Sequence, residues 1–349
     1  MLLLSQLLKG FLRFFGIPLG LFVGAFSLLL AVSFGAADIG IVDVLQSLNA
    51  HVFGINETLG LKDRIIMELR LPRVLLAFIA GAGLSIAGSV LQTVTRNPLA
   101  DPYLFGISSG ASFGAVVVLT LLGQGILSYY GLTWVGLPIG ALIGAGLSVF
   151  IVLSMCGKDV GRQVERMLLS GVAVSFMFGA LSSLMLYFSS PQAAASVLFW
   201  SLGSFAKATW SGLMLPALVV VFCTAIILLF QRSIIAMKMG DETAHTLGIN
   251  VSLLRVGMLI LCSTITATLV ASCGGIGFVG LMIPHIVRLI FPGQLSLILT
   301  GVLGGIFMIW VDVLARTMLS SQELPVGIIT AVIGSLFFLF VLKTRKQEA

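Results

Sequence analysis

The chain of 349 residues is 58% hydrophobic and only 9% charged, and its mean hydropathy is +1.16. A water-soluble globule of this length could not carry that composition without exposing large apolar surfaces, so the soluble classes are excluded. The formal net charge of +6 does not indicate nucleic-acid binding, because the basic residues lie in short segments between apolar runs. The composition predicts an all-α, polytopic membrane protein.

Apolar runs long enough to cross a bilayer recur along the whole chain. The first run follows Lys9 and Arg13 and is too long for the core of a signal peptide, so we expect it to be retained. Pro98 and Pro102 flank a turn after the second run that a helix cannot continue. In chain order we predict about ten spans, within 14–37, 74–95, 103–157 (two), 167–188, 208–231, 256–288 (two), 295–316 and 324–342.

Three shorter segments interrupt or join these runs. An amphipathic piece, 42–53, lies in the polar loop that follows the first span. The segment 193–205 follows a Ser-Ser-Pro break and is too short to cross, so it is a candidate half-helix that dips into the membrane. The glycines within 273–277 divide the run 256–288 into two spans, because several glycines destabilise a helix interior.

Small residues indicate how the predicted helices pack. The chain contains 40 glycines, and pairs such as Gly140 and Gly144 or Gly301 and Gly305 have the spacing that lets helix backbones approach closely in lipid. The four cysteines lie in or at the ends of apolar runs without metal-ligand spacing, so we interpret them as packing residues: Cys156, Cys223, Cys262 and Cys273. Neither a disulfide framework nor a metal site is indicated.

The distribution of basic residues predicts the orientation. Lysine and arginine concentrate in loops on the cytoplasmic side of a membrane. With ten spans and both termini inside, most of the 19 basic residues face the cytoplasm. The exceptions, which would lie outside, are Lys62, Arg64, Arg70, Arg73, Lys207 and Arg316. Three of them, Arg70, Arg73 and Arg316, lie at span ends, where they suit lipid headgroups or an acidic partner.

One polar segment, residues 232–255, stands between two long uncharged runs, and we call it the polar island. Within it, residues 241–248 predict a short helix, because two acids occupy the first turn and a glycine follows the last. A short exposed helix on a membrane protein is a candidate docking element. An amphipathic helix that rests at the membrane interface remains an equal alternative.

Signatures of catalysis are few. The sequence contains no phosphate-binding loop for ATP and no His-Glu-x-x-His zinc motif. The residues Gly106-Ile-Ser108-Ser-Gly110 match the nucleophile elbow of serine hydrolases, but that elbow requires a strand before the serine, which a helical context does not offer. His285 follows Pro284 and precedes Arg288, so we interpret it as a hydrogen-bonded residue near a helix end rather than a proton relay.

Four long motifs stand in order along the chain. They are Arg70-Leu-Pro-Arg73, Asn97-Pro-Leu-Ala-Asp-Pro102, Gly274-Gly-Ile-Gly-Phe-Val-Gly-Leu-Met-Ile-Pro-His285-Ile-Val-Arg288 and Glu323-Leu-Pro-Val-Gly-Ile-Ile-Thr-Ala-Val-Ile-Gly334. In this order and spacing they resemble the permease family of ATP-binding cassette importers for iron-siderophores, haem and cobalamin. The resemblance covers about residues 14–342.

The resemblance implies a type II importer permease in the bacterial inner membrane. The whole chain, 1–349, would form one transmembrane domain with about ten helices and cytoplasmic termini. The chain would be a transport subunit and not an enzyme, with no cofactor of its own, because ATP is hydrolysed by partner chains. The implied partners are a second permease copy, two ATPase subunits and a periplasmic substrate-binding protein, with lipid around them and no nucleic acid.

The same resemblance assigns roles to particular residues. The polar island would couple the chain to the ATPase through Asp241, Glu242, Ala244, His245, Leu247 and Gly248. Arginines at family positions would meet acids of the binding protein, namely Arg70, Arg73 and Arg316, although Asp312 could occupy Arg316 as an i,i+4 pair. The cytoplasmic gate would comprise Asn97, Leu99, Val164 and Glu165, and the last two depart from the small hydroxyl residues of the cobalamin-importing relative.

Two other functions fit parts of the sequence. A stand-alone ion-coupled transporter would need paired ionisable residues near the membrane midplane, and the apolar runs offer few. An intramembrane serine hydrolase built on Ser108 is a more distant alternative. Within the importer hypothesis the motifs do not separate ferric siderophore, haem and cobalamin as cargo. A homodimer is expected because closed two-fold pairing is the commonest assembly.

Overall fold

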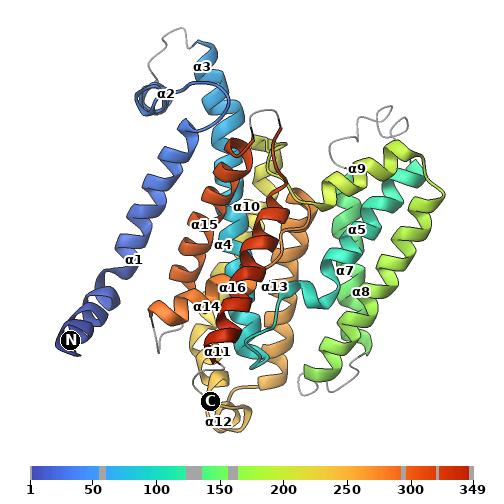
Figure 1. Ribbon diagram of the computed structural model, residues 1–349. Coiled ribbons are helices and arrows are strands. Elements are labelled where there is room, and N and C mark those ends of the chain that lie inside the picture. The colour runs from blue at the N-terminus through green and yellow to red at the C-terminus, as the bar shows by residue number, and fades with distance from the viewer. Residues whose placement is uncertain are drawn as a thin grey trace.

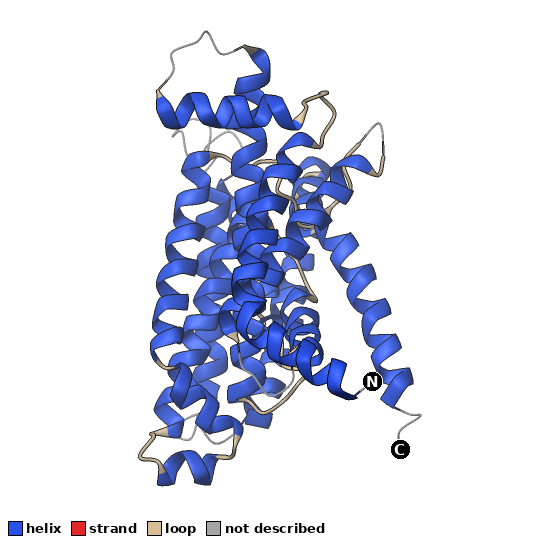
Figure 2. Cartoon of the chain, turned by 90° about the vertical axis from the view of Figure 1, so that its left-hand side faces the viewer, coloured by secondary structure: helices blue, strands red, loops and turns tan. Residues whose placement is uncertain are grey.

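The computed structural model describes residues 2–54, 60–122, 136–155, 164–291, 296–319 and 322–345, and every element described is helical (Figures 1 and 2). Seven of these helices are long and apolar enough to cross a membrane. Three shorter apolar helices, Ile107–Thr120, Val279–Ile290 and Val326–Val341, complete the ten that the sequence predicts. The all-α, polytopic prediction is confirmed.

The helices differ in length. The seven long spans are α1 (Leu2–Ser33), α4 (Leu71–Val94), α7 (Gly136–Met155), α8 (Val164–Tyr187), α10 (Trp210–Leu229), α13 (Val251–Cys273) and α15 (Leu297–Thr317). The other helices are α2 (Ile41–Phe53), α3 (Leu61–Arg64), α5 (Ile107–Val117), α9 (Pro191–Ser201), α11 (Gln231–Lys238), α12 (Asp241–Thr246), α14 (Val279–Ile290) and α16 (Val326–Arg345).

Both termini lie at the same end of the bundle as α12, and α2 lies at the opposite end (Figures 1 and 2). We call the end that carries α12 the inner end and the end that carries α2 the outer end. The amphipathic piece expected at 42–53 forms α2, and the candidate half-helix at 193–205 forms α9, near the outer end. The predicted break at 273–277 is the connection between α13 and α14. The break near 123–136 lies outside the described residues.

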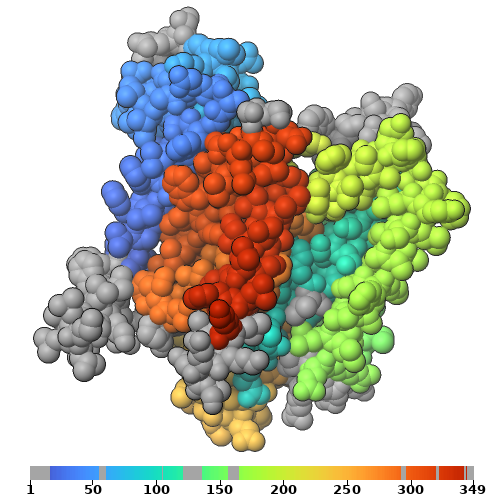
Figure 3. Space-filling view, viewed as in Figure 1, coloured from blue at the N-terminus to red at the C-terminus, as the bar shows by residue number. Residues whose placement is uncertain are grey.

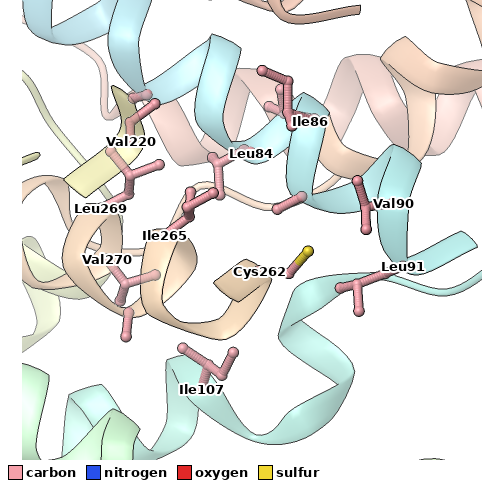
Figure 4. Close-up of a cluster of buried hydrophobic side chains, with 14 of the residues drawn as sticks. Leu84, Ile86, Val90, Leu91, Ile107, Val220, Cys262, Ile265, Leu269 and Val270 are labelled. Carbon is pink, nitrogen blue, oxygen red and sulfur yellow. The ribbon is translucent and has the colours of Figure 1, made fainter. Parts of the chain in front are cut away.

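Helix α4 is the centre of the bundle. It continues α3 through a π-helical turn, Ile65–Arg70, so that residues 61–94 form one helix. In the apolar part of this helix, 78% of the residues are buried. It packs against α1, α10, α13, α14 and α15. Figure 4 shows Leu84 and Leu91 of α4 facing Ile265 and Cys262 of α13. Cys223, Cys262 and Cys273 are buried and unpaired, as expected for packing residues, and Cys156 lies outside the described residues.

Close backbone contact joins α5 to α7. Gly110 and Gly114 of α5 lie against Gly144 and Gly140 of α7, in antiparallel order. A Cβ atom added at Gly144 would overlap the carbonyl oxygen of Gly110, and one added at Gly114 would overlap the carbonyl oxygen of Gly140. Because lipid gives little hydrophobic drive between helices, such close van der Waals packing stabilises the pair.

Two glycines two residues apart on α7 provide a matched test of this packing. Gly144→Ala should lower the free energy of unfolding by about 1–3 kcal/mol, because the methyl group meets backbone that cannot move aside. Gly146→Ala should be neutral or stabilising by about 0.5–1 kcal/mol, because open space surrounds that position and alanine favours the helix. Thermal unfolding of the detergent-solubilised variants measures the difference, and equal midpoints for the two would contradict the packing.

Candidate functional site

The polar island folds as two short helices at the inner end. Helix α11 (Gln231–Lys238) continues almost directly from α10, and α12 follows after Gly240. Gly248, with φ of 79°, adopts the left-handed conformation that stops α12, and the N–H of Ile249 donates to the carbonyl of Ala244 at 3.1 Å. Figure 3 shows α12 as the lower tip of the molecule. The predicted helix and its glycine stop are confirmed.

Helix α12 presents different residues to its own chain and to solvent. Ala244 is 0% exposed, whereas Leu247 is 64% exposed, and Glu242 and His245 are also exposed. The expectation that Ala244 touches a partner is therefore corrected, because the side chain is covered by its own protein. Leu247 is the apolar residue of α12 that a partner can reach.

Asp241 begins α12 and holds it against the bundle. Its carboxylate accepts a hydrogen bond from Arg255 Nη2 at 2.8 Å and lies 3.2 Å from Arg96 Nη2. Arg255, which the sequence places at the edge of the polar island, lies inside α13 with 1% of its side chain exposed. The interior side of the island thus combines this ionic contact with buried apolar side chains such as Met237 and Ala244, and its solvent side carries the apolar Leu247.

The expected gate residues lie in two segments at the inner end (Figure 1). Asn97 Oδ1 accepts a hydrogen bond from the N–H of Leu99 at 2.9 Å, which fixes the turn after α4 and leaves the Leu99 side chain 60% exposed. Glu165 is exposed in the first turn of α8, and the Val164 side chain lies outside the described part of the structure. No hydrogen bond or ion pair of the described residues joins Asn97 or Leu99 to Glu165.

Arg70 at the outer end is buried and completes the end of α1. Its guanidinium donates to the carbonyls of Val32 and Ser33 at 2.9 and 2.8 Å, and to that of Ala37 at 2.6 Å. The last carbonyls of a helix have no partner within the helix, and a cationic donor satisfies them. Arg316 adds a bond to the carbonyl of Ala31 at 3.1 Å. These two arginines therefore cap α1.

Arg73 and Arg316 also neutralise a buried acid. Asp312 of α15 is 0% exposed, and Arg73 of α4 forms a bidentate pair with it, in which Nη2 donates to Oδ1 at 2.9 Å and Nε donates to Oδ2 at 3.1 Å. Arg316 Nη2 lies 3.3 Å from Asp312 Oδ2, which confirms the i,i+4 pair considered for it. Arg73 Nη1 reaches Glu323 as well, and Glu323 is 47% exposed. Docking of a partner by these arginines stays a prediction.

Two contacts to aspartates, one from a lysine and one from a serine, hold α2 onto α3 at the outer surface. Lys62 Nζ donates to Asp43 Oδ2 at 2.8 Å, and this bond holds the pKa of Asp43 below its usual value. The hydroxyl of Ser47 donates to Asp63. The outer end therefore carries a folded cap above the spans.

The hydrolase motif does not form a nucleophile elbow. Ser108 lies in the first turn of α5, after a 3-10 turn at Pro102–Phe105, where the elbow would require a strand. His285 packs edge-to-face on Phe337 of α16, with ring centroids 5.7 Å apart. Each residue is thus explained by helix packing.

Two contacts important to the site were missed from the sequence. The pair of Arg73 and Asp312 joins residues 239 positions apart, and no local pattern signals it. The second contact is the pair of Arg255 with Asp241. Arg255 stands at the start of an apolar run, and that position was the available signal that its side chain faces inward.

Comparison with known proteins agrees with this geometry. Residues 21–344 match the model of the FecCD transport family. The chain is 34% identical over 327 residues to the hemin transport system permease of Yersinia pestis, covering 92% of this chain and 95% of the relative. It is 36% identical over 299 residues to the cobalamin import system permease of Halobacterium salinarum, covering 85% of this chain and 77% of the relative.

A solved structure shares the fold. It is a metal-chelate type ABC transporter in an inward-facing conformation, with a TM-score of 0.79 and 28% identity over 94% of this chain and 98% of that chain. The agreement of family model, relatives and fold spans nearly the whole sequence. The chain therefore belongs to the FecCD transport family.

Proposed function

We propose that the chain is the permease subunit of a bacterial inner-membrane importer that carries a metal chelate, such as a ferric siderophore, haem or cobalamin, into the cytoplasm. The observation that carries the proposal is the family match over residues 21–344. The ten apolar helices supply the membrane path, and the exposed α11 and α12 supply a surface for an ATPase at the inner end. ATP hydrolysis belongs to that partner.

The rival function of an ion-coupled transporter requires ionisable pairs inside the membrane. The ion pairs of the described residues lie towards the two ends of the bundle. Those at the outer end involve Asp43, Asp63, Glu68, Asp312 and Glu323, and those at the inner end involve Asp241. This arrangement favours a transporter driven from its surface by a partner.

The proposal is tested by reconstitution. The chain is co-expressed with an ATPase and a binding protein of the same system, and the complex is placed in vesicles that contain ATP. Uptake of ferric siderophore, haem and cobalamin is measured in parallel, with a chain lacking residues 232–250 as the control. ATP-dependent uptake of one cargo supports the proposal and identifies the cargo. Uptake that needs an ion gradient and no ATP would overturn it.

For coupling, we propose that Leu247 enters a groove of the ATPase, with Glu242, His245 and the Gly248 stop around it, while Ala244 and Asp241 fix the helix from within.

For docking, we propose a role for the outer cluster, which consists of Arg70, Arg73, Asp312 and Arg316. Arg73 would exchange its exposed partner, Glu323, for a carboxylate of the binding protein. Arg70 and Arg316 support this face by holding α1. Two permease copies would form the path, with Asn97, Leu99, Val164 and Glu165 at its inner end.

Leu247→Asp should weaken ATPase binding by about 1–3 kcal/mol, because a charge would enter a water-excluding groove. Leu247→Ala should have a smaller effect. Neither should lower the thermal midpoint of the permease, because the side chain is 64% exposed in the chain alone. Ala244→Asp should instead destabilise the permease itself. Co-purification of the ATPase and import into vesicles measure the effect, and parental import by Leu247→Asp would make α12 an interfacial helix.

Glu323→Gln should increase the affinity of the binding protein at low salt. The substitution removes the exposed partner of Arg73, while Asp312 keeps the guanidinium in place. An exposed pair contributes about 0.2–1 kcal/mol, so the expected gain is up to about fivefold. Glu68→Gln is the matched control, since it removes one exposed outer acid that pairs with Arg64. Equal affinities of the two variants would remove Arg73 from the docking surface.

A further inference from the structure

The carboxylate of Asp241 lies between two guanidinium groups that come from different parts of the chain. Arg255 of α13 donates to Oδ1 at 2.8 Å, and Arg96, in the turn after α4, lies 3.2 Å from Oδ2. The side chain of Arg255 is 1% exposed and that of Arg96 is 50% exposed. Because each oxygen has its own cation, the carboxylate holds α12 in one orientation.

Arg255 also reaches the inner end of α4. Its Nε donates to the carbonyl of Val94 at 2.7 Å. That carbonyl belongs to the last turn of α4, where the carbonyl groups have no N–H donor within the helix. One buried side chain therefore connects α12, α13 and α4, and its burial leaves little room for independent movement.

Arg96 continues this connection into the turn that follows. Its φ is 51°, in the left-handed region that non-glycine residues rarely adopt. The next residue is Asn97, which fixes the turn containing Leu99. The contact between Arg96 and Asp241 thus gives a reason for an arginine at a position whose backbone favours glycine or asparagine.

The orientation of α12 fits this connection. Asp241 and Ala244 are three residues apart and lie on one face of the helix, towards the bundle, whereas Leu247 is exposed. A force applied to the exposed side of α12 reaches the rest of the chain through the face that carries Asp241.

We infer that Asp241 transmits displacement of α12 to the segment Asn97–Leu99, through its ion pair with Arg96, while Arg255 holds α12 to the inner ends of α4 and α13. The inference rests on the proposed function, which makes α12 the ATPase contact and Asn97–Leu99 part of the gate. Asp241 is a positioning residue, and it acts on the gate through Arg96. A merely structural cluster would affect folding and assembly but not the response of the gate to ATP.

The decisive variant is Arg96→Asn. Asparagine tolerates the left-handed backbone, so the turn can persist, and the pair of Asp241 with Arg255 stays intact. Asp241→Asn removes the carboxylate charge with which both arginines pair, and Asp241→Glu restores a negative charge on a longer side chain. Lys343→Gln is the control, because it removes an exposed charge on α16, away from the cluster.

The experiment uses the complete complex in vesicles. Import, ATP hydrolysis and bound ATPase are measured for each variant. Gate movement is followed in parallel chains that carry Leu99→Cys and alanine at the four native cysteines, as the rate of labelling by a membrane-impermeant maleimide with and without ATP.

Arg96→Asn should retain the ATPase and hydrolyse ATP within about twofold of the parent, because the exposed face of α12 and the pair of Asp241 with Arg255 are unchanged. Import should fall about tenfold, and ATP should no longer change the labelling rate at position 99. The double variant should fall no further than either single variant, and Asp241→Glu should recover part of the import.

If Arg96→Asn imports cargo and responds to ATP like Lys343→Gln, the inference is wrong. If Asp241→Asn fails to accumulate, Arg96→Asn alone decides. Failure of the proposed function looks different, since the parental complex itself would then show no ATP-dependent import.

Discussion

Helix 61–94 passes through the whole bundle, and its strongest polar contacts are made at its two ends with other helices of the chain. At the outer end Arg70 caps α1 and Arg73 neutralises Asp312. At the inner end the carbonyl of Val94 accepts a hydrogen bond from Arg255. Buried charged groups must find partners inside the protein, because an unpaired charge that is shielded from water is costly. The position of this helix therefore determines where α1, α13 and α15 can lie.

The outer cluster is costly to break. Removing one partner of a buried pair costs about 3–5 kcal/mol, because the remaining charge stays buried without compensation. Asp312 has two arginines, and both are tied to other elements as well. Because each arginine makes several contacts, the outer end is expected to stay fixed. The inner cluster, Arg96, Asp241 and Arg255, differs, since the side chains of Arg96 and Asp241 are 50% and 33% exposed. Movement driven from the inner surface would meet less resistance there.

The sequence was sufficient for the class of fold and for the location of α12. Long uncharged runs reveal spans directly, and Gly248 marks the end of α12 because its backbone needs a positive φ. Local pattern could not reveal that Ala244 faces inward, since a six-residue helix has no apolar period long enough to define a face. The pairing of Arg73 with Asp312 could not be found from local pattern either, because the two residues lie 239 positions apart, whereas the i,i+4 spacing of Asp312 and Arg316 does indicate their pair.

The glycine pairs also show what the sequence cannot reveal, namely which helices pack together. The spacing of Gly140 and Gly144 predicts close packing, but only the fold identifies Gly110 and Gly114 as the opposing surface. A Cβ atom added at Gly146, on the same helix, would meet no atom within 4 Å in the described structure. Composition and spacing therefore indicate that helices approach closely, and tertiary structure decides which ones do.

The central claim is that α12 and the turn after α4 move as one unit relative to a fixed outer end. The most direct measurement is of distances between spin labels at Thr246, Leu99 and Leu69, in complexes in which one permease copy is labelled. On ATP binding, the account predicts an unchanged distance from Thr246 to Leu99, while both residues shift relative to Leu69. A change between Thr246 and Leu99 as large as that between Thr246 and Leu69 would contradict it.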